Sequence, residues 1–234
     1  MEAIIPALMR AIVAAFLALW TVAGVAQLER ISRSDATAAL RAALEKGSTA
    51  AVANLGRTDG FLANPQVRIP LPESAQRAER MMRRVGMGRY ADELTLTINR
   101  AAESAVPEAR SLFVDSIRKM SVQDAKGILT GGETSGTEYF RRTTRGELHR
   151  RFLPIVQKAT GRVQLAQKYD QYAEKAVAVG MLDKSDADLD EYVTQKALEG
   201  LYLMVAEEEK KIRKDPVSAG SAVIRKVFGL LSSS

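Results

Sequence analysis

The sequence predicts an all-α protein, a single irregular bundle of about eight or nine helices with one extended, proline-rich arm. Alanine is abundant while aromatic residues make up only 6% of the chain, a balance that favours helices packed through small side chains over a β-sandwich. Apolar residues recur at three- and four-residue steps along most of the chain, whereas a strand-like alternation occurs only once. We find neither an internal repeat nor an interdomain linker.

The first 26 residues differ from the rest of the chain. Arg10 is followed by fifteen uncharged, almost wholly apolar residues, AIVAAFLALWTVAGV, and small residues stand at Gly24 and Ala26. This order is typical of a secretory signal peptide. The run is short of the roughly 20 residues that cross a bilayer, so an uncleaved anchor is the second interpretation and a buried helix the third.

We therefore expect a signal peptide at residues 1–26 and a single α-helical domain at residues 27–234. Such a protein is exported to the periplasm of a Gram-negative bacterium, or anchored to the inner membrane if the signal stays uncleaved. The chain has no cysteine, which excludes disulfides, thiolate metal sites, a cysteine nucleophile and a lipid-modified N-terminal cysteine. The net charge of +6 permits attraction to anionic partners, but solubility explains it as simply.

Helical segments follow one another along the domain, each with recognisable ends. Ser34 or Asp35 suits the N-cap of the first helix, and Gly56 stops it. The stretches SVQD, from residue 121, and DLDE, from residue 188, have the box-like spacing that opens a helix. A helix or helix pair with interruptions near Gly146 and Pro154 is expected over about 137–163. The other expected helices lie at about 35–54, 75–85, 90–105, 107–120, 121–131, 163–179, 188–214 and 216–228.

Residues 56–72, GRTDGFLANPQVRIPLP, carry three prolines and two glycines and do not fit a regular helix. The alternation of Val67, Ile69 and Leu71 with polar residues and proline gives one short strand-like run. We expect an extended arm that is pinned to the helical body by these three side chains and Phe61. A peptide-binding edge is the alternative, although proline limits the hydrogen bonds that such an edge can donate.

Residues 127–140, GILTGGETSGTEYF, raise the question of a phosphate-binding loop. Such loops follow a strand and end in a lysine that reaches the phosphates, whereas this stretch follows a helix and lacks the lysine. Glu133 in its middle would repel phosphate. The simpler interpretation is a connector, in which Gly131 and Gly132 end one helix and Thr134 or Ser135 caps the next. An anion site is the alternative.

Two other polar features have simple structural interpretations. The acidic stretch DKSDADLDEY fails as a calcium loop, because Glu191 stands at its sixth position and Ala197 at its twelfth; it suits a helix start instead. His149 is the only histidine and is surrounded by arginines, which indicates a surface side chain of a basic helix. We predict no metal site and no cofactor.

Basic clusters occur at residues 77–84, 141–151 and 210–214, and acidic residues are interleaved with them. Nucleic-acid grooves usually add aromatic platforms to such charge, so we interpret these clusters as solvated ion-pair faces. In EEEKKIRK, the spacing pairs Glu207 with Lys211 and Glu209 with Arg213 along a self-neutralising face.

The candidate binding residues are Asn99, Arg100, Glu103, Glu133 and Tyr139. Asn99 and Glu103 lie one helical turn apart beside the apolar stripe of their helix, where a partly buried polar group needs partners. A hydrogen-bond network between helices is the structural interpretation, and a ligand pocket is the functional one. No residue carries a catalytic motif.

Several stretches taken together resemble one family: GFLANPQVRIPLPE, NRAAESAVPEA, DAKGILTGGETSGTEYFR, LDEYVTQKALEGLY and EEEKKIRKDP. Over about residues 34–229, the chain resembles the uncharacterised bacterial proteins of domain of unknown function 4197. Members resemble exported envelope proteins, often with a signal peptide or a lipobox, and the absence of cysteine sets this chain apart from the lipobox type. The resemblance implies no activity and transfers no catalytic residue.

The sequence therefore favours a non-enzymatic periplasmic protein that binds an envelope partner or a small ligand, or serves a structural role there. The first alternative is a hydrolase of an envelope polymer, with Glu103 and Glu133 as acid and base. The second alternative is a basic surface that binds anionic membrane or nucleic acid. Of these partners, nucleic acid is disfavoured. Membrane contact is expected only through an uncleaved N-terminal segment.

Overall fold

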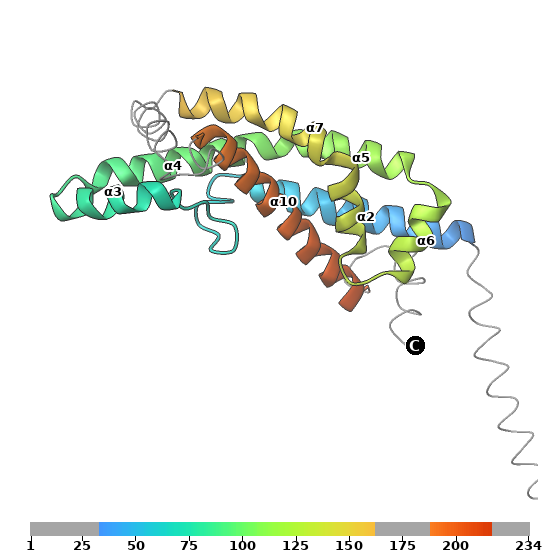
Figure 1. Ribbon diagram of the computed structural model, residues 1–234. Coiled ribbons are helices and arrows are strands. Elements are labelled where there is room, and N and C mark those ends of the chain that lie inside the picture. The colour runs from blue at the N-terminus through green and yellow to red at the C-terminus, as the bar shows by residue number, and fades with distance from the viewer. Residues whose placement is uncertain (1–32, 162–187, 217–234) are drawn as a thin grey trace, which may run out of the picture.

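The computed structural model describes residues 33–161 and 188–216, whose regular elements are all helical (Figure 1). The all-α prediction is confirmed, but these residues contain seven α-helices and one short 3-10 helix rather than eight or nine α-helices. Residues 1–26 and the helices predicted at 163–179 and 216–228 lie outside the described residues. The elements are α2 (Arg33–Leu55), α3 (Glu73–Arg84), α4 (Gly88–Ala105), η1 (Val106–Glu108), α5 (Ala109–Lys119), α6 (Val122–Thr130), α7 (Ser135–Thr160) and α10 (Leu189–Lys214).

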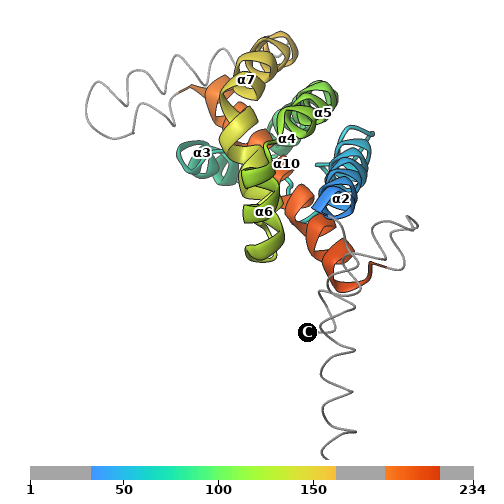
Figure 2. The same cartoon turned by 90° about the vertical axis from the view of Figure 1, so that its right-hand side faces the viewer.

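Helix α10 runs obliquely across the bundle and packs chiefly on α7 and α2 (Figure 1, Figure 2). Helix α4 packs along α7, and α5, which follows the η1 turn, packs on α7 as well. Three buried aromatic side chains of the core meet where α5, α7 and α10 pack together. The ring centroids of Phe113 and Phe140 are 4.6 Å apart, and Tyr202 lies 6.3 Å from Phe113. No helix among the residues described here is long and apolar enough to cross a membrane.

Helix α7 is continuous, so the interruptions predicted near Gly146 and Pro154 are wrong. A proline inside a helix costs about 3 kcal/mol, because it removes a hydrogen bond and crowds the preceding turn. Burying one large apolar side chain contributes about 1.5–3 kcal/mol, and α7 buries several on a single face. Packing therefore outweighs the local penalty. The core-facing apolar side chains of α7 are Tyr139, Phe140, Leu148, Phe152 and Val156.

Residues 56–72, the connection between α2 and α3, form a series of turns as far as residue 67, so the predicted extended arm is not what the structure shows. The four side chains predicted to pin this segment, Phe61, Val67, Ile69 and Leu71, are all buried. A Cβ atom on Gly200 of α10 would come within 2.9 Å of the ring of Phe61, so a glycine is needed there. The turns keep the apolar residues over α10 and α4 instead of leading them away from the bundle.

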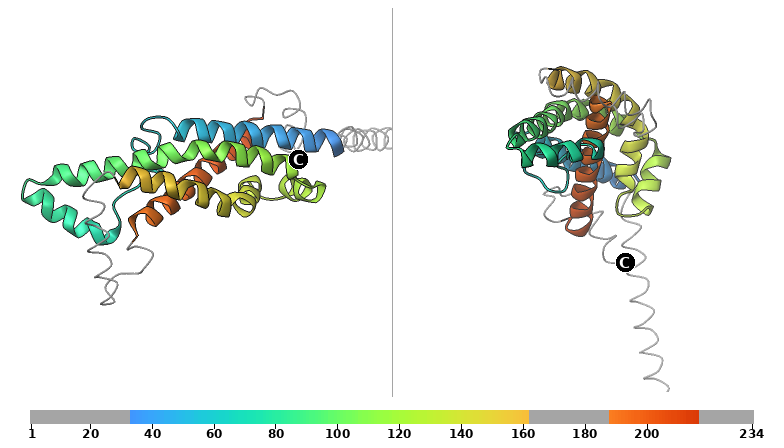
Figure 3. Two further views of the ribbon diagram at one scale, coloured as in Figure 1. Left: turned by 90° about the horizontal axis from the view of Figure 1, so that it is seen from above. Right: turned by 60° about the vertical axis from the view of Figure 1, so that its left-hand side comes forward.

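Helices α3 and α4 form a helical hairpin, and α3 packs mainly on α4. The turn between them lies at one end of the described structure, at the left in Figure 1 and in the left-hand view of Figure 3. The end of the helix predicted at about residues 75–85 is confirmed, since α3 ends at Arg84 and Gly86 has a φ of 77° between α3 and α4.

Candidate functional site

Asn99 of α4 clamps the 56–72 connection rather than lining an open pocket. Its side chain is fully buried. The amide nitrogen Nδ2 donates to the carbonyl oxygens of Ile69 and Thr95, at 2.9 and 2.8 Å, and Oδ1 accepts from the backbone N–H of Ile69 at 2.9 Å. Because both backbone groups of Ile69 lie in the protein interior, Asn99 supplies the partners that water cannot.

Arg100, which follows Asn99 directly, and Glu103, one turn further along α4, hold the same connection nearer its start. Glu103 is 3% exposed, and its Oε1 accepts from the backbone N–H groups of Phe61 and Leu62 at 3.0 and 3.2 Å. Arg100 donates to Oε2 of Glu103 at 2.6 Å and to Asp59 at 2.7 Å. The structure therefore brings three of the five candidate binding residues together, as the hydrogen-bond network of the structural interpretation.

The Gly-rich stretch leads to an anion site that the protein fills with its own side chain. The carboxylate of Glu209, from α10, accepts from the backbone N–H groups of Gly136 and Thr137 at 2.9 and 2.8 Å, and from the Thr137 hydroxyl at 2.8 Å. These N–H groups belong to the first turn of α7, which has no intrahelical partner for them and attracts negative charge. We call this contact the α7 plug.

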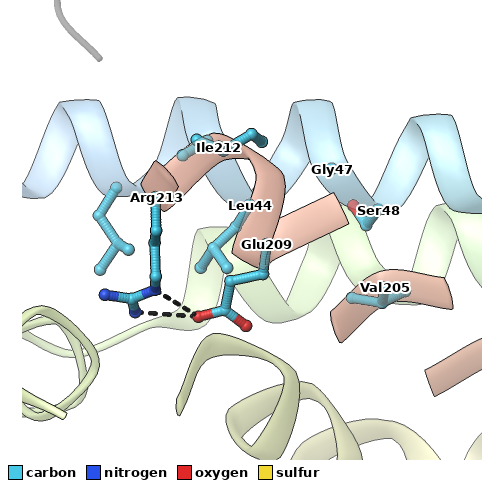
Figure 4. A pocket seen from close by; sticks show the side chains of 9 residues that line it. Leu44, Gly47, Ser48, Val205, Glu209, Ile212 and Arg213 are labelled. Atoms are coloured by element: carbon cyan, nitrogen blue, oxygen red, sulfur yellow. Dashed lines mark hydrogen bonds and ion pairs between the residues drawn. The ribbon is translucent and has the colours of Figure 1, made fainter. Parts of the chain in front are cut away.

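Arg213, one turn after Glu209 on α10, completes the α7 plug. It donates to Oε1 of Glu209 at 2.9 Å, to the Ile128 carbonyl at 3.0 Å and to the Ser135 hydroxyl at 3.0 Å. Figure 4 shows Glu209 and Arg213 joined beside Leu44, next to a cavity of about 20 Å³ between α2 and α10. The arginine thus ties the end of α6 to the start of α7.

The predicted ion pair of Glu209 with Arg213 is confirmed, but the prediction that it lies on a solvated face is wrong. Glu209 is 8% exposed, because docking of α10 turns it toward α7. Lys211 pairs with Glu208 rather than with the predicted Glu207, which pairs with Lys210. Three consecutive glutamates are equivalent in the local pattern, and no sequence signal separates the buried one from its neighbours.

The remaining two candidate binding residues lie by the start of α7, apart from the α4 network. Glu133 is exposed in the turn between α6 and α7. Tyr139 is buried and donates its hydroxyl to the carbonyl oxygen of Ser116 at 2.7 Å. It also contributes to the wall of an open groove of about 530 Å³ beside α6, near Arg142. The five candidates therefore belong to two places in the fold.

A larger groove, of about 660 Å³, lies between residues 70–73, α7 and α10. We call it the α7–α10 groove. Its back wall is a chain of polar side chains that crosses between the two helices. Arg145 donates to Gln195 at 2.8 Å, and Gln195 donates to Glu191 at 2.7 Å. Glu191 is held in turn by His149, which does not itself line the groove and whose Nε2 lies 2.8 Å from the Glu191 carboxylate. The other lining side chains include Glu73, Gln76, Tyr192, Lys196 and Glu199.

The opposite wall of the groove is the Pro70–Leu71–Pro72 segment, which is fixed from both sides. Tyr192 donates its hydroxyl to the Pro70 carbonyl at 3.1 Å, and Gln76 donates to the Leu71 carbonyl at 3.1 Å. The Asn99 clamp holds the preceding residue. The candidate binding residue Asn99 therefore shapes this wall from behind, without lining the groove itself.

His149 is a partly exposed side chain of α7, and the sequence did not predict that it is bonded to Glu191. Burial alone would raise the pKa of the Glu191 carboxyl, but hydrogen bonds from Gln195 and His149 outweigh it, and the pKa lies below its usual value. The helix start predicted from DLDE is confirmed, with Asp188 accepting from the Glu191 N–H at 2.9 Å. The contact of Glu191 with His149 joins residues 42 positions apart, and no local sequence pattern predicts it.

Comparison with known proteins identifies the chain by family. The family model described as protein of unknown function, DUF4197, matches residues 30–229. The chain belongs to the DUF4197 family. The matched residues include the α4 network, the α7 plug and both walls of the α7–α10 groove, so all three features lie within the region that defines this DUF4197 protein. No curated protein and no solved structure matches the chain.

Proposed function

We propose that this DUF4197 protein is a non-enzymatic binding protein of the cell envelope, which holds its partner in the α7–α10 groove. The groove itself carries the proposal, because it combines an open space of about 660 Å³ with walls that are held by hydrogen bonds to neighbouring elements. A space of this size takes a drug-sized ligand or a few residues of polypeptide. Fixed walls reduce the entropy that a partner must overcome on binding.

The charges of the groove favour a ligand with both signs of charge, such as a polypeptide segment, over a purely anionic one. Arg145 and Lys196 line the groove together with Glu73 and Glu199. The one ion pair among them, Lys196 with Glu199 at 2.8 Å, is solvent-exposed. Exposed pairs contribute at most about 1 kcal/mol, so a ligand can exchange their partners at little cost.

The hydrolase alternative receives no support from its two candidate carboxylates. Glu103 accepts hydrogen bonds from two backbone N–H groups and from Arg100, so it has no access to a substrate. Glu133 belongs to an exposed turn beside α6. An acid and a base must face the same bond, and these two groups serve different parts of the fold.

Export remains part of the proposal and has its own test. The apolar run after Arg10 motivates it. Fusion of the first 30 residues to a reporter enzyme that is active only in the periplasm should give activity. An inactive fusion that is expressed at the same level would contradict export to the envelope, and it would leave the argument for binding in the groove unchanged.

A photo-crosslinking amino acid at Lys196, on the rim of the groove, tests the binding function directly. The same amino acid at Lys119, exposed at the end of α5, serves as the matched control. We expect an adduct of defined mass from position 196 in intact cells, and none from position 119. The Gln195→Ala variant, which removes the link between Arg145 and Glu191, should weaken that adduct while the helical circular dichroism stays unchanged.

Two outcomes would contradict the proposed binding function. Equal adducts from positions 196 and 119 would show that proximity on the surface, rather than the groove, produces the crosslink. No adduct from position 196 over a range of growth conditions would leave the groove without a partner.

A further inference from the structure

The turn between α3 and α4 presents apolar side chains to solvent at one end of the described structure. Val85 is 66% exposed and Met87 is 46% exposed, on either side of the left-handed Gly86. Large apolar side chains that stand this far out of a fold, next to each other and at its tip, are typical of an interaction site. Figure 3 shows that this turn projects beyond the remainder of the bundle.

Arginines surround this apolar tip. Arg80, Arg84 and Arg89 are all exposed, and residues 79–92 contain four arginines and two acidic residues. The fourth, Arg83, pairs with both acids, Glu79 at 2.8 Å and Asp92 at 2.5 Å. Both acidic side chains of the tip therefore pair with the same arginine, and the net charge of residues 79–92 is positive.

The tip also carries an aromatic ring with a polar end. The guanidinium of Arg89 lies 4.7 Å from the centre of the Tyr90 ring, and its Nη2 donates to the Tyr90 hydroxyl at 2.9 Å. Tyrosine and arginine are residues that sit at the boundary between lipid headgroups and hydrocarbon. Apolar side chains at a tip, a positive surround and an interfacial tyrosine form the pattern of a shallow membrane contact.

We propose that the α3–α4 tip docks on an anionic lipid surface. Val85 and Met87 enter the boundary of the acyl chains, while Arg80, Arg84 and Arg89 contact the headgroup phosphates. A nucleic-acid partner would use the same arginines but would give the apolar tip nothing to bury. The contact leaves the α7–α10 groove open, so the protein can hold a partner while it lies on a membrane.

The absence of cysteine makes a site-specific test direct, since one introduced cysteine is the only site of labelling. An environment-sensitive fluorophore is attached to Met87→Cys or, as a matched control, to Val122→Cys, another exposed apolar residue, at the start of α6. The full chain is mixed with vesicles of phosphatidylcholine and phosphatidylglycerol. Because both labelled proteins share the same N-terminal segment, membrane insertion of that segment affects them alike.

We expect the emission from position 87 to shift to the blue and to be quenched by a lipid-borne quencher, while position 122 responds to neither. Changing both Arg80 and Arg84 to glutamate should reduce the vesicle partition coefficient of the protein labelled at position 87 by at least about tenfold, since each basic residue near an anionic surface strengthens the attraction of the protein to it. The same double change at Arg118 and Lys119 of α5 should leave the response of the tip unchanged.

Three results would overturn the inference. Position 87 could respond no more than position 122, or it could respond equally to vesicles of phosphatidylcholine alone. The label could also respond to a DNA or RNA oligonucleotide and not to the anionic vesicles, which would reassign the arginines to nucleic acid.

Discussion

Replacing Glu209 by alanine removes the α7 plug and changes no residue of the α7–α10 groove or the α3–α4 tip. The change leaves the N–H groups of Gly136 and Thr137 and the Thr137 hydroxyl without their acceptor, and it leaves Arg213 without its carboxylate. Gly136 and Thr137 are buried, so water replaces the lost acceptor poorly. Hydrogen bonds to a charged group each contribute about 1.5–3 kcal/mol, and breaking a buried pair from one side costs about 3–5 kcal/mol.

We therefore expect Glu209→Ala to lower the free energy of unfolding by about 3–5 kcal/mol. Urea unfolding followed by circular dichroism at the helical minimum measures this quantity. The matched control is Glu207→Ala, two residues away on the same helix, whose ion pair with Lys210 is partly exposed. An exposed pair contributes at most about 1 kcal/mol, so the control should stay close to the wild type.

The two variants differ only in which glutamate is lost, so their comparison isolates the contact with α7. A loss at Glu209 within about 0.5 kcal/mol of the loss at Glu207 would refute the reasoning, because it would mean that the α7 N-terminus is satisfied without the carboxylate. A double-mutant cycle with Arg213→Ala then shows how much of the effect belongs to the ion pair.

Three further predictions concern the other polar and glycine positions. Asn99→Leu should destabilise the fold by about 2–4 kcal/mol by leaving a buried peptide group without partners, and limited proteolysis should then cut within the 56–72 connection first. Gly136→Ala should destabilise the fold by about 1–3 kcal/mol, since its Cβ would lie 2.5 Å from a Leu44 methyl group. Gly146→Ala, whose Cβ would have nothing within 4 Å, should stabilise the fold by about 0.5–1 kcal/mol. Thermal unfolding should therefore show a lower melting temperature for the first variant and a higher one for the second. Because the pKa of Glu191 is lowered in the folded state, its ionised form contributes stability above its ordinary pKa of 4.5, and this contribution is lost as the pH falls below that value. The melting temperature of the wild type should therefore fall more steeply between about pH 6 and about pH 3 than that of Glu191→Gln, and parallel curves would contradict the assignment.

Local signals were sufficient for most helix boundaries because caps and apolar spacing act over only a few residues. The SVQD box is confirmed in both directions, with the Ser121 hydroxyl accepting from the Asp124 N–H at 3.1 Å and Asp124 accepting from the Ser121 N–H at 3.2 Å. Gly131 ends α6 as predicted. The break expected at Pro154 failed for the complementary reason, since contacts with other helices decide whether a local penalty is tolerated.

The candidate binding residues likewise separate what local sequence predicts from what contacts between distant segments decide. The sequence located Asn99 and Glu103 as polar side chains beside an apolar stripe, and it offered a structural network as one interpretation. Which interpretation holds depends on the partners of these side chains, the backbone of Ile69 and Phe61, which lie 30 and 42 residues away. No periodicity within α4 carries that information.

The sequence by itself determined the helical class, most helix ends and the family, because these follow from hydrogen bonds and apolar spacing within a few turns. It also argued correctly that the Gly-rich stretch has neither the strand nor the lysine of a phosphate loop. Only the tertiary structure decided that the start of α7 is nevertheless an anion site, because its anion is Glu209 from a helix 72 residues further along the chain. The α7–α10 groove and the exposed α3–α4 tip were decided there too, since both depend on how α10 and the hairpin pack and not on any single segment.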